Sequence, residues 1–406
     1  MRIVYLYQYF ATPRMPGGIR TYELARRLVA DGHEVHVLTC DTSAERARAR
    51  WRTTDEDGIT VHWLPVPYSN SMGFARRVQA FLHFAAAASV RATRLRGDVV
   101  LASSTPLTIV LPGLVACVLS RARFVFEIRD LWPELPIAIG ALGNPVTRRA
   151  AWVMARTAYR RADHVVALSP GMADGAIAQG ADPDRVSVVS NASDLALFDV
   201  DPSAVADFRR SRPWLGDRPL VVYIGTFGQI NGVGYLVRLA AEMAELDPEV
   251  RFLLVGGGRE RDEVTVLARE LGVLDRSVIV ERTIPKREVP AVLGAATVAT
   301  SLFLPIREME TNSANKFFDS LAAGRPQAIN YGGWQAEILT MTGAGAVLDP
   351  TDHRRAALRL RELLHDEAWL AAASVAARKV AEERFARDDL YETFAAAVTG
   401  REPGRR

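Results

Sequence analysis

The chain alternates twice between apolar strand-like runs, glycine-containing turns and helices, and this pattern limits its fold more than any other feature. Residues 2–7 are apolar without alternation, as expected of a parallel strand that is covered on both faces. A loop containing Gly17 and Gly18 follows, then a helix and a second strand at 33–39. The same order of elements restarts at Arg218. We therefore predict an α/β protein with two Rossmann-like, doubly wound domains.

The restart also predicts the domain boundaries, and a length of 406 residues favours two domains. We expect an N-terminal domain at 1–200 and a second domain at 201–385. Residues 386–406 are expected to form a helix that crosses back to the first domain, followed by a tail. Ligands of such domains bind beyond the carboxyl ends of the strands, so we expect the two domains to face a central cleft.

Composition favours a cytoplasmic enzyme. Apolar residues make up 49% of the chain, as in globular proteins. Cys40 and Cys117 lie in apolar runs and do not form a disulfide framework, and no Cys/His cluster has zinc spacing. The chain opens on a strand rather than a signal peptide, and its longest apolar stretch, 107–119, is too short to span a bilayer. We expect no metal, no cofactor and no nucleic-acid partner.

A basic segment at 76–96 suggests peripheral contact with the inner face of a membrane. Five arginines bracket the apolar stretch 81–90, which is typical of a helix lying on an anionic lipid surface. They are Arg76, Arg77, Arg91, Arg94 and Arg96. The alternative is a surface helix whose apolar side packs on the core.

The segment 308–326 (EMETNSANKFFDSLAAGRP) is a polar, amide-rich loop that runs into a helix. A helix start offers unpaired N–H groups and partial positive charge to an anion, and Lys316 adds a full charge. Asp319 can accept hydrogen bonds from sugar hydroxyls. The segment therefore predicts a nucleotide-diphosphate site; the alternative is an ordinary capped helix with a solvated lysine.

Other polar or glycine-rich turns follow strands at the same predicted edge. YIGTFGQINGVG and the later GGG turn contribute Gly225, Thr226, Gly228, Asn231 and Gly257. FEIRDLWPELP places a carboxylate and an arginine beside an aromatic ring, a combination suited to sugars, although Asp130 could instead cap a helix. The turn MPGGIR lacks the G-x-G-x-x-G pattern, which argues against a dinucleotide-dependent oxidoreductase. Aspartate pairs at 55–57 and 182–184 fall away from this edge, so no metal site is predicted.

Seven segments in order resemble glycosyltransferase family 4, a retaining family of the GT-B fold. They are PGGIRTYELARRLVADGHEVHVLT, FEIRDLWPE, ADHVVALSPGM, VSVVSNASDLALF, YIGTFGQINGVGYLV, FLLVGGGRERDEV and NSANKFFDSLAAGRP. The chain is most similar to bacterial O-antigen and capsule enzymes, including N-acetyl-fucosamine transferases. The resemblance implies metal-independent transfer of a hexose or an N-acetyl or amino-deoxyhexose from a nucleotide-diphosphate sugar, with UDP expected. The acceptor hydroxyl would belong to a saccharide, a lipid-linked saccharide or a small molecule, in surface polysaccharide or antibiotic biosynthesis.

The resemblance also implies roles for individual residues. Asp319 matches the second of the family's two acidic positions. The first falls on Thr311, so either Glu310 serves through a local shift, or Asn312 and backbone groups take over its role. The family's Arg/Lys pair after the first strand of the second domain is missing, and Lys316 and the N-terminus of its helix are the natural substitutes. The expected catalytic residues are Arg129, Asp130, Glu310 and Lys316. The expected donor-binding residues are Gly17, Gly18, Gly225, Thr226, Gly228, Asn231, Gly257, Asn312, Ser313, Asn315 and Asp319.

Two other functions are compatible with two such domains. A GT-B sugar-nucleotide epimerase would need a cluster of His, Asp and Glu around the sugar, and the seven histidines show none. A noncatalytic sugar-binding protein would normally be exported and carry a signal peptide.

Overall fold

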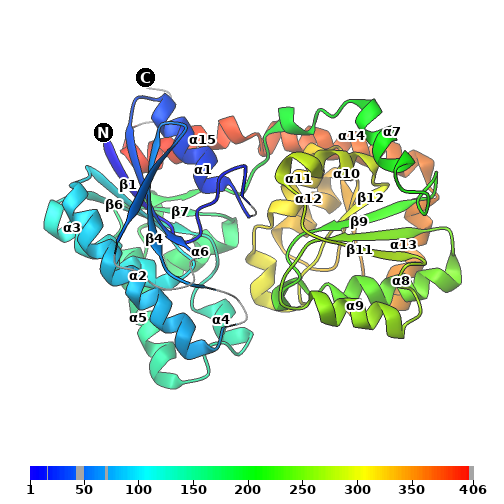
Figure 1. Cartoon of the computed structure of the whole chain (residues 1–406), viewed down its shortest axis with the longest axis horizontal. Coiled ribbons are helices and arrows are strands. Elements are labelled where there is room, and N and C mark those ends of the chain that lie inside the picture. The colour runs from blue at the N-terminus through cyan, green and yellow to red at the C-terminus, as the bar shows by residue number, and fades with distance from the viewer. Residues whose placement is uncertain (16, 43–49, 69–71, 402–406) are drawn as a thin grey trace. The chain divides into compact units, whose positions relative to one another are not determined.

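The computed structural model describes residues 1–15, 17–42, 50–68 and 72–401, and it contains two sheets (Figure 1). The chain folds into two compact units. Unit 1 comprises Met1–Ser190, Thr311–Ser313 and the C-terminal residues from Asp388, and unit 2 comprises Asn191–Glu310 and Ala314–Arg387. Each unit has its own sheet and its own helical layers.

The sheet of unit 1 has the strand order β3-β4-β2-β1-β5-β6-β7-β8. Its parallel strands are β1 (Arg2–Leu6), β2 (Glu34–Asp41), β4 (Ile59–Pro65), β5 (Val99–Ser103), β6 (Arg123–Ile128), β7 (His164–Ala167) and β8 (Val186–Val188). The edge strand β3 (Arg52–Glu56) runs antiparallel to β4. The sequence analysis missed β3, because its residues RTTDE are polar and largely exposed and so carry no apolar pattern.

Helices cover both faces of this sheet. On one face lie α2 (Phe74–Leu95), α3 (Val110–Ser120), α5 (Pro145–Arg161) and α6 (Pro170–Ala178), which pack on alternate strand residues such as Val4, Leu6 and Phe126. On the other face lie α1 (Arg20–Ala30) and α15 (Arg387–Thr399), packed on the intervening residues such as Ile3 and Tyr5. Short α4 (Glu134–Ala138) follows β6. Alternation of side chains across each strand thus builds two separate cores.

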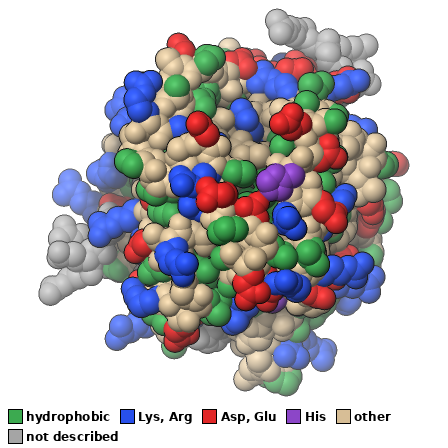
Figure 2. Space-filling model, turned by 90° about the vertical axis from the view of Figure 1, so that its right-hand side faces the viewer, with side chains coloured by type: hydrophobic (Ala, Val, Ile, Leu, Met, Phe, Trp, Pro, Cys, Tyr) green, Lys and Arg blue, Asp and Glu red, His purple; other side chains and the backbone are tan. Residues whose placement is uncertain are grey.

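Unit 2 contains a six-stranded parallel sheet in the order β11-β10-β9-β12-β13-β14. The strands are β9 (Leu220–Ile224), β10 (Arg251–Val255), β11 (Val278–Glu281), β12 (Val298–Ser301), β13 (Gln327–Ile329) and β14 (Gly345–Val347). The helices are α7 (Pro202–Arg210), α8 (Gly234–Leu246), α9 (Arg261–Glu270), α10 (Val289–Ala295), α11 (Asn315–Ala322), α12 (Trp334–Thr342), α13 (His353–Leu364) and α14 (Glu367–Arg384). Figure 2 shows the side of the molecule on which α13 lies in Figure 1. Acidic and basic side chains are interspersed on this side.

The strand order in unit 2 reverses between β9 and β12, which is the topological switch point of a doubly wound sheet. In unit 1 the reversal lies between β1 and β5. Ligands of such sheets bind beyond the carboxyl ends of these strands. The predicted fold of two doubly wound α/β domains is confirmed.

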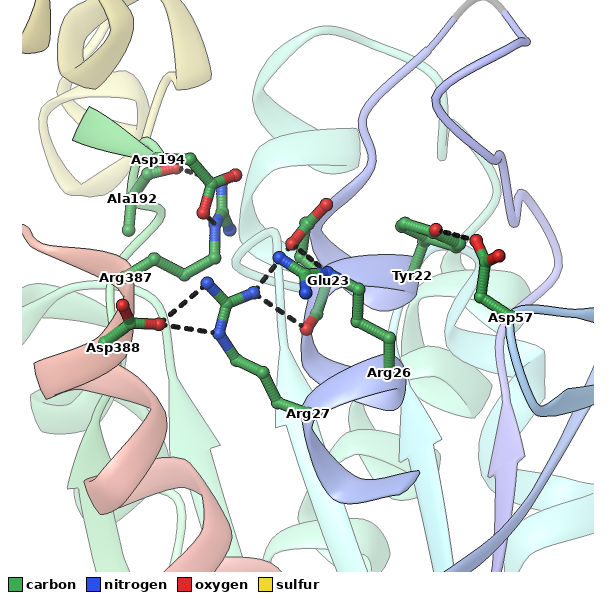
Figure 3. Close-up of polar contacts among 9 residues, drawn as sticks. All are labelled: Tyr22, Glu23, Arg26, Arg27, Asp57, Ala192, Asp194, Arg387 and Asp388. Atoms are coloured by element: carbon green, nitrogen blue, oxygen red, sulfur yellow. Dashed lines mark hydrogen bonds and ion pairs between the residues drawn. The ribbon is translucent and has the colours of Figure 1, made fainter. Parts of the chain in front are cut away.

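The last helix is attached within unit 1 (Figure 3). The Arg27 guanidinium in α1 binds the Asp388 carboxylate at 2.7 Å. Tyr391 in α15 also donates a hydrogen bond to Asp31. Just before this point the chain is held within unit 2, where Arg387 binds Asp194 at 3.0 Å and the Ala192 carbonyl at 2.7 Å. The end of unit 2 is therefore tied to the residues at which unit 2 begins.

Candidate functional site

The loops that follow β9 and β10 pack directly against each other at the carboxyl edge of unit 2. Phe227 N donates to Gly257 O at 2.8 Å, and Gly225 N donates to Val255 O at 3.0 Å. A Cβ on Gly256 would lie 1.9 Å from Gly225 O. Glycine is therefore required here for contact between the two loops. Thr226 and Gly258 are exposed on the outside of this pair of loops.

Lys316 lies in the first turn of α11 and points into this edge. Its Nζ donates to Asn231 Oδ1 at 2.7 Å and to Tyr223 Oη at 3.3 Å. The rings of Tyr223 and Phe303 lie 4.8 and 5.3 Å from the same nitrogen. Among the residues that the structure describes, no carboxylate forms an ion pair with it. Burial lowers the pKa of Lys316 to about 7, because its charge is taken from water without a negative partner.

The entrance of α11 is not an ordinary capped helix. Its N-cap is Ala314, and no side chain makes a cap hydrogen bond. Asn312 and Ser313 are buried instead, with Ser313 N donating to Asn312 Oδ1 at 2.6 Å, and both belong to unit 1. Asn315 is exposed as the first residue of the helix. The alternative of a capped helix with a solvated lysine is thus wrong on both points.

Asp319, one turn further along α11, is held by two partners. It accepts hydrogen bonds from Lys286 and from the Ser193 hydroxyl, and its side chain is 14% exposed. Lys286 also lies 5.3 Å from the Phe198 ring. The sequence analysis assigned no role to Lys286 or to Ser193. Lys286 lies 33 residues and Ser193 lies 126 residues from Asp319 in the sequence. No local sequence pattern reveals contacts over such separations.

Glu310 lies against the turn after β13. Its side chain is on the exposed surface, and a Cβ on Gly332 would lie 3.3 Å from its Oε1. A Cβ on Gly333, which has φ +81°, would lie 2.3 Å from Glu310 O. Glycine at 333 therefore allows the Glu310 backbone to approach the β13 turn closely, and glycine at 332 leaves room for the Glu310 side chain. Among the described residues, none contacts both the Glu310 side chain and the Lys316 ammonium.

Arg129 and Asp130 lie at the carboxyl edge of unit 1, immediately after β6. Arg129 stacks on the Tyr7 ring at 4.5 Å, and its Nη1 donates to Thr21 Oγ1 at 3.3 Å. Asp130 accepts a hydrogen bond from Thr105, a residue with φ +86° in the loop after β5. Helix α4 begins at Glu134 with Pro133 as its N-cap, so Asp130 is not a helix cap. The sequence alternative of a cap is wrong.

Gly17 and Gly18 are exposed in the loop that leads to α1. Gly17 has φ +126°, a conformation that residues with a Cβ rarely adopt. The pair thus allows a tight turn before α1, whose second residue, Thr21, contacts Arg129.

A buried charge network supports this edge of unit 1. Glu127 in β6 is fully buried and forms a 2.9 Å ion pair with Arg20, the first residue of α1. Tyr5 Oη donates to the same carboxylate at 3.0 Å, and Arg20 also donates to Val189 O at 2.9 Å. Burial by itself raises the pKa of Glu127, but the charges of Arg20 and Arg129 outweigh it and lower the pKa.

The sequence reasoning missed this network, although a glutamate inside the strand RFVFEI was a signal for it. A charge in a strand that is covered on both faces needs a partner. Among the described residues, no group of three His, Cys, Asp or Glu side chains could hold a metal ion. In the same part of the chain, no helix is long and apolar enough to cross a membrane.

Comparison with known proteins agrees with the two-domain reading. Residues 17–192 match the family model described as "Glycosyl transferase 4-like domain", and residues 205–380 match "Glycosyl transferases group 1". The chain belongs to the GT-B glycosyltransferases. The earlier resemblance to this family is thus confirmed, whereas its narrower similarity to N-acetyl-fucosamine transferases is not.

Two mycobacterial relatives of this glycosyltransferase are named as mannosyltransferases. It is 28% identical to the GDP-mannose-dependent alpha-(1-6)-phosphatidylinositol monomannoside mannosyltransferase of Mycolicibacterium smegmatis, over 68% of each chain. It is also 28% identical to the GDP-mannose-dependent alpha-mannosyltransferase of Mycobacterium tuberculosis, over 78% of this chain and 75% of the relative. The crystal structure of Anabaena HepE in complex with UDP and glucose has the same fold, with a TM-score of 0.74 at 18% identity, covering 99% of this chain and all of HepE.

Within this glycosyltransferase, the predicted site residues fall into separate groups. In unit 2, Lys316 lies beside Asn231 and Gly225, where a Cβ on Gly225 would be 3.2 Å from the Lys316 Cε. Asp319 forms a second group with Lys286. In unit 1, Arg129 and Asp130 follow the same strand but have different partners, Thr21 and Thr105.

Proposed function

We propose that this glycosyltransferase moves a hexose, or an N-acetyl or amino-deoxyhexose, from a nucleotide-diphosphate sugar to an acceptor hydroxyl with retention of configuration and without a metal ion. The observation that carries the proposal is the ammonium of Lys316, a half-buried residue. It lies at the switch point of the unit 2 sheet and faces loops whose backbone can come close to a ligand, and its partners among the described residues are neutral.

A diphosphate would supply the negative charge that Lys316 lacks. Charge-assisted hydrogen bonds of this kind are about twice as strong as neutral ones. Lys316 would bind the leaving diphosphate and stabilise the charge that grows on it as the bond from the sugar C1 breaks. Asp319, held in place by Lys286 and Ser193, would accept hydrogen bonds from the ribose hydroxyls. Exposed Thr226 and Asn315 and half-buried Gly257 would line the same donor site.

The acceptor would use the edge of unit 1. Arg129 and Asp130 carry hydrogen-bonding groups suited to sugar hydroxyls, and their partners Thr21 and Thr105 hold them in place. In the transfer, the acceptor oxygen forms a bond to C1 on the face from which the diphosphate leaves. The acceptor proton passes to a leaving phosphate oxygen, so no dedicated strong base is needed. The acceptor would be a surface saccharide, a lipid-linked saccharide or an antibiotic precursor.

A panel of radiolabelled UDP-, GDP- and dTDP-sugars tests this proposal, read out as nucleotide release with and without mixed saccharide acceptors. The sequence led us to expect UDP, and HepE was crystallised with UDP. Both mycobacterial relatives are instead named for GDP-mannose. The comparison of UDP-sugars with GDP-sugars is therefore the most informative part of the panel. Acceptor-dependent release supports the proposal. Release or inversion without any acceptor would instead support an epimerase, and binding without turnover would support a sugar-binding protein.

Asp130→Asn separates a role in acceptor positioning from a structural one. It keeps an oxygen for the Thr105 hydroxyl but removes the charge. We expect turnover to fall about tenfold while donor affinity and the melting temperature change little. A lower melting temperature with normal turnover per folded molecule would contradict the assignment.

A further inference from the structure

The surface formed by α2, α3 and α5 of unit 1 has an unusual charge distribution. These helices pack side by side on one face of the sheet, as Figure 1 shows. Together they contain nine arginines and no aspartate or glutamate. Helices of unit 2 mix the two signs, and Figure 2 shows that mixture on one of its sides. The basic surface of unit 1 therefore differs from the ordinary surface of the same protein.

Helix α3 is apolar on its exposed side as well as on its buried side. Its sequence VLPGLVACVLS has no charged residue. Val118 is 78% exposed and Leu119 is 65% exposed, and they continue a stripe that begins at Leu111 and Val115 with helical spacing. A helix that is apolar all round is normally enclosed by other apolar groups. An outward row of large aliphatic side chains therefore needs an apolar partner.

Helix α5 combines apolar and basic residues on its outer side. Val146 and Val153 are exposed on this side. Each is followed three residues later by an exposed arginine, Arg149 and Arg156. Trp152 lies beneath Arg156, with the guanidinium 5.6 Å from its ring. The long aliphatic stem of arginine allows its charge to reach phosphates while the stem stays in contact with apolar groups. Between α3 and α5 runs an apolar groove of about 540 Å³, lined by Leu111, Leu114, Val146, Val153 and Met154.

We propose that the α3 and α5 face is a docking surface for an anionic lipid bilayer. The apolar stripe of α3 would enter the interface between headgroups and acyl chains, and the arginines of α5 would bind lipid phosphates. Helix α3 has only 11 residues, so it lies on the membrane rather than crossing it. The basic segment 76–96 contributes less than its composition suggests, because Arg91 is used inside the unit, 3.0 Å from His62 Nδ1.

Binding of the full chain to lipid vesicles tests this surface without any sugar donor, so the result is independent of the proposed transfer reaction. We expect the protein to sediment with vesicles of phosphatidylcholine and phosphatidylglycerol and to bind pure phosphatidylcholine at least tenfold more weakly. Val118→Ser/Leu119→Ser should weaken binding about tenfold. Arg149→Gln/Arg156→Gln should weaken it by roughly fivefold per arginine and make it less sensitive to salt.

Matched controls use equally exposed residues of unit 2. Met341→Ser/Val375→Ser, with both side chains 70% exposed, and Arg210→Gln/Arg355→Gln should leave vesicle binding unchanged. Melting temperatures of all four variants should match that of the parent protein. Equal binding to neutral vesicles, or equal losses in the controls, would overturn the proposal. So would a dimer that Val118→Ser/Leu119→Ser converts to a monomer, because the surface would then pair with a second copy.

Discussion

Both units hold a cation beyond the carboxyl ends of their central strands, Arg129 in unit 1 and Lys316 in unit 2. Arg129 lies in the field of the buried Glu127 carboxylate, which also binds Arg20. Within the described part of the chain, the hydrogen-bond partners of Lys316 are the neutral groups of Asn231 and Tyr223. A buried charge with a partner within the protein is stable without a ligand, whereas one without such a partner costs free energy until an anion arrives.

The charges around Glu127 therefore form a structural network, whereas the charge of Lys316 is suited to binding an anionic ligand. The network around Glu127 should determine whether unit 1 folds, and Lys316 should determine whether the protein binds its donor. The substitutions below remove charges from these two groups, and we compare their effects on folding stability and on donor binding.

The largest effect is expected from Glu127→Ala. It leaves Arg20 buried without its partner, which typically costs about 3–5 kcal/mol of folding free energy. Denaturant unfolding followed by tryptophan fluorescence measures the loss. The double variant Arg20→Met/Glu127→Met removes both charges and should recover most of it. If the single and double variants were equally unstable, packing rather than charge would be the reason.

Lys316→Met should lower donor affinity by roughly 2–3 kcal/mol, or about 30- to 150-fold, since it removes a charge-assisted contact to the diphosphate. Stability should not fall, because the uncompensated charge disappears. Isothermal titration with the donor and thermal unfolding provide the two readouts. Lys379→Met, at an exposed position on α14, is the control and should change neither quantity. Loss of stability with unchanged affinity would make Lys316 structural.

The pH dependence of donor binding provides a third comparison. The pKa of Lys316 is lowered to about 7, so the ammonium is present below that pH and lost above it. Donor affinity should be constant below pH 7 and fall up to tenfold per pH unit above it, until the bound form also loses its proton. The folded state should become more stable as pH rises from about 7 toward the usual lysine pKa. In this range the lysine binds a proton on unfolding, and a higher pH makes that proton uptake less favourable. Lys316→Met should remove both trends, and trends that persist in it would exclude Lys316.

Asp319→Asn should have the smallest effect. It keeps an oxygen for Ser193 but loses the ion pair with Lys286, which is partly exposed and so contributes little to stability. Affinity for the free nucleoside diphosphate should fall about fivefold, corresponding to roughly 1 kcal/mol. Lys286→Met, which leaves the carboxylate in place, should have a smaller effect on the nucleoside. Equal effects of the two variants would mean that the ion pair, and not the carboxylate, is what matters.

Sequence patterns alone determined the two doubly wound domains and the position of most strands, because apolar runs and glycine turns are properties of neighbouring residues. The same patterns placed Asn231, Lys316, Asp130 and Asp319 after strands or at a helix start. They could not find β3, whose polar residues are paired on one side only.

Only the tertiary structure decided what the polar residues do. Glu127 and Arg20 are 107 residues apart, and Lys316 meets Asn231 across 85 residues. Such partners are chosen by the order in which strands lie side by side, and no local pattern records that order. Partial burial then changes the chemistry. The pKa of Lys316, which lies beside the rings of Tyr223 and Phe303, is lowered to about 7, because a surrounding of low dielectric constant penalises an unpaired charge.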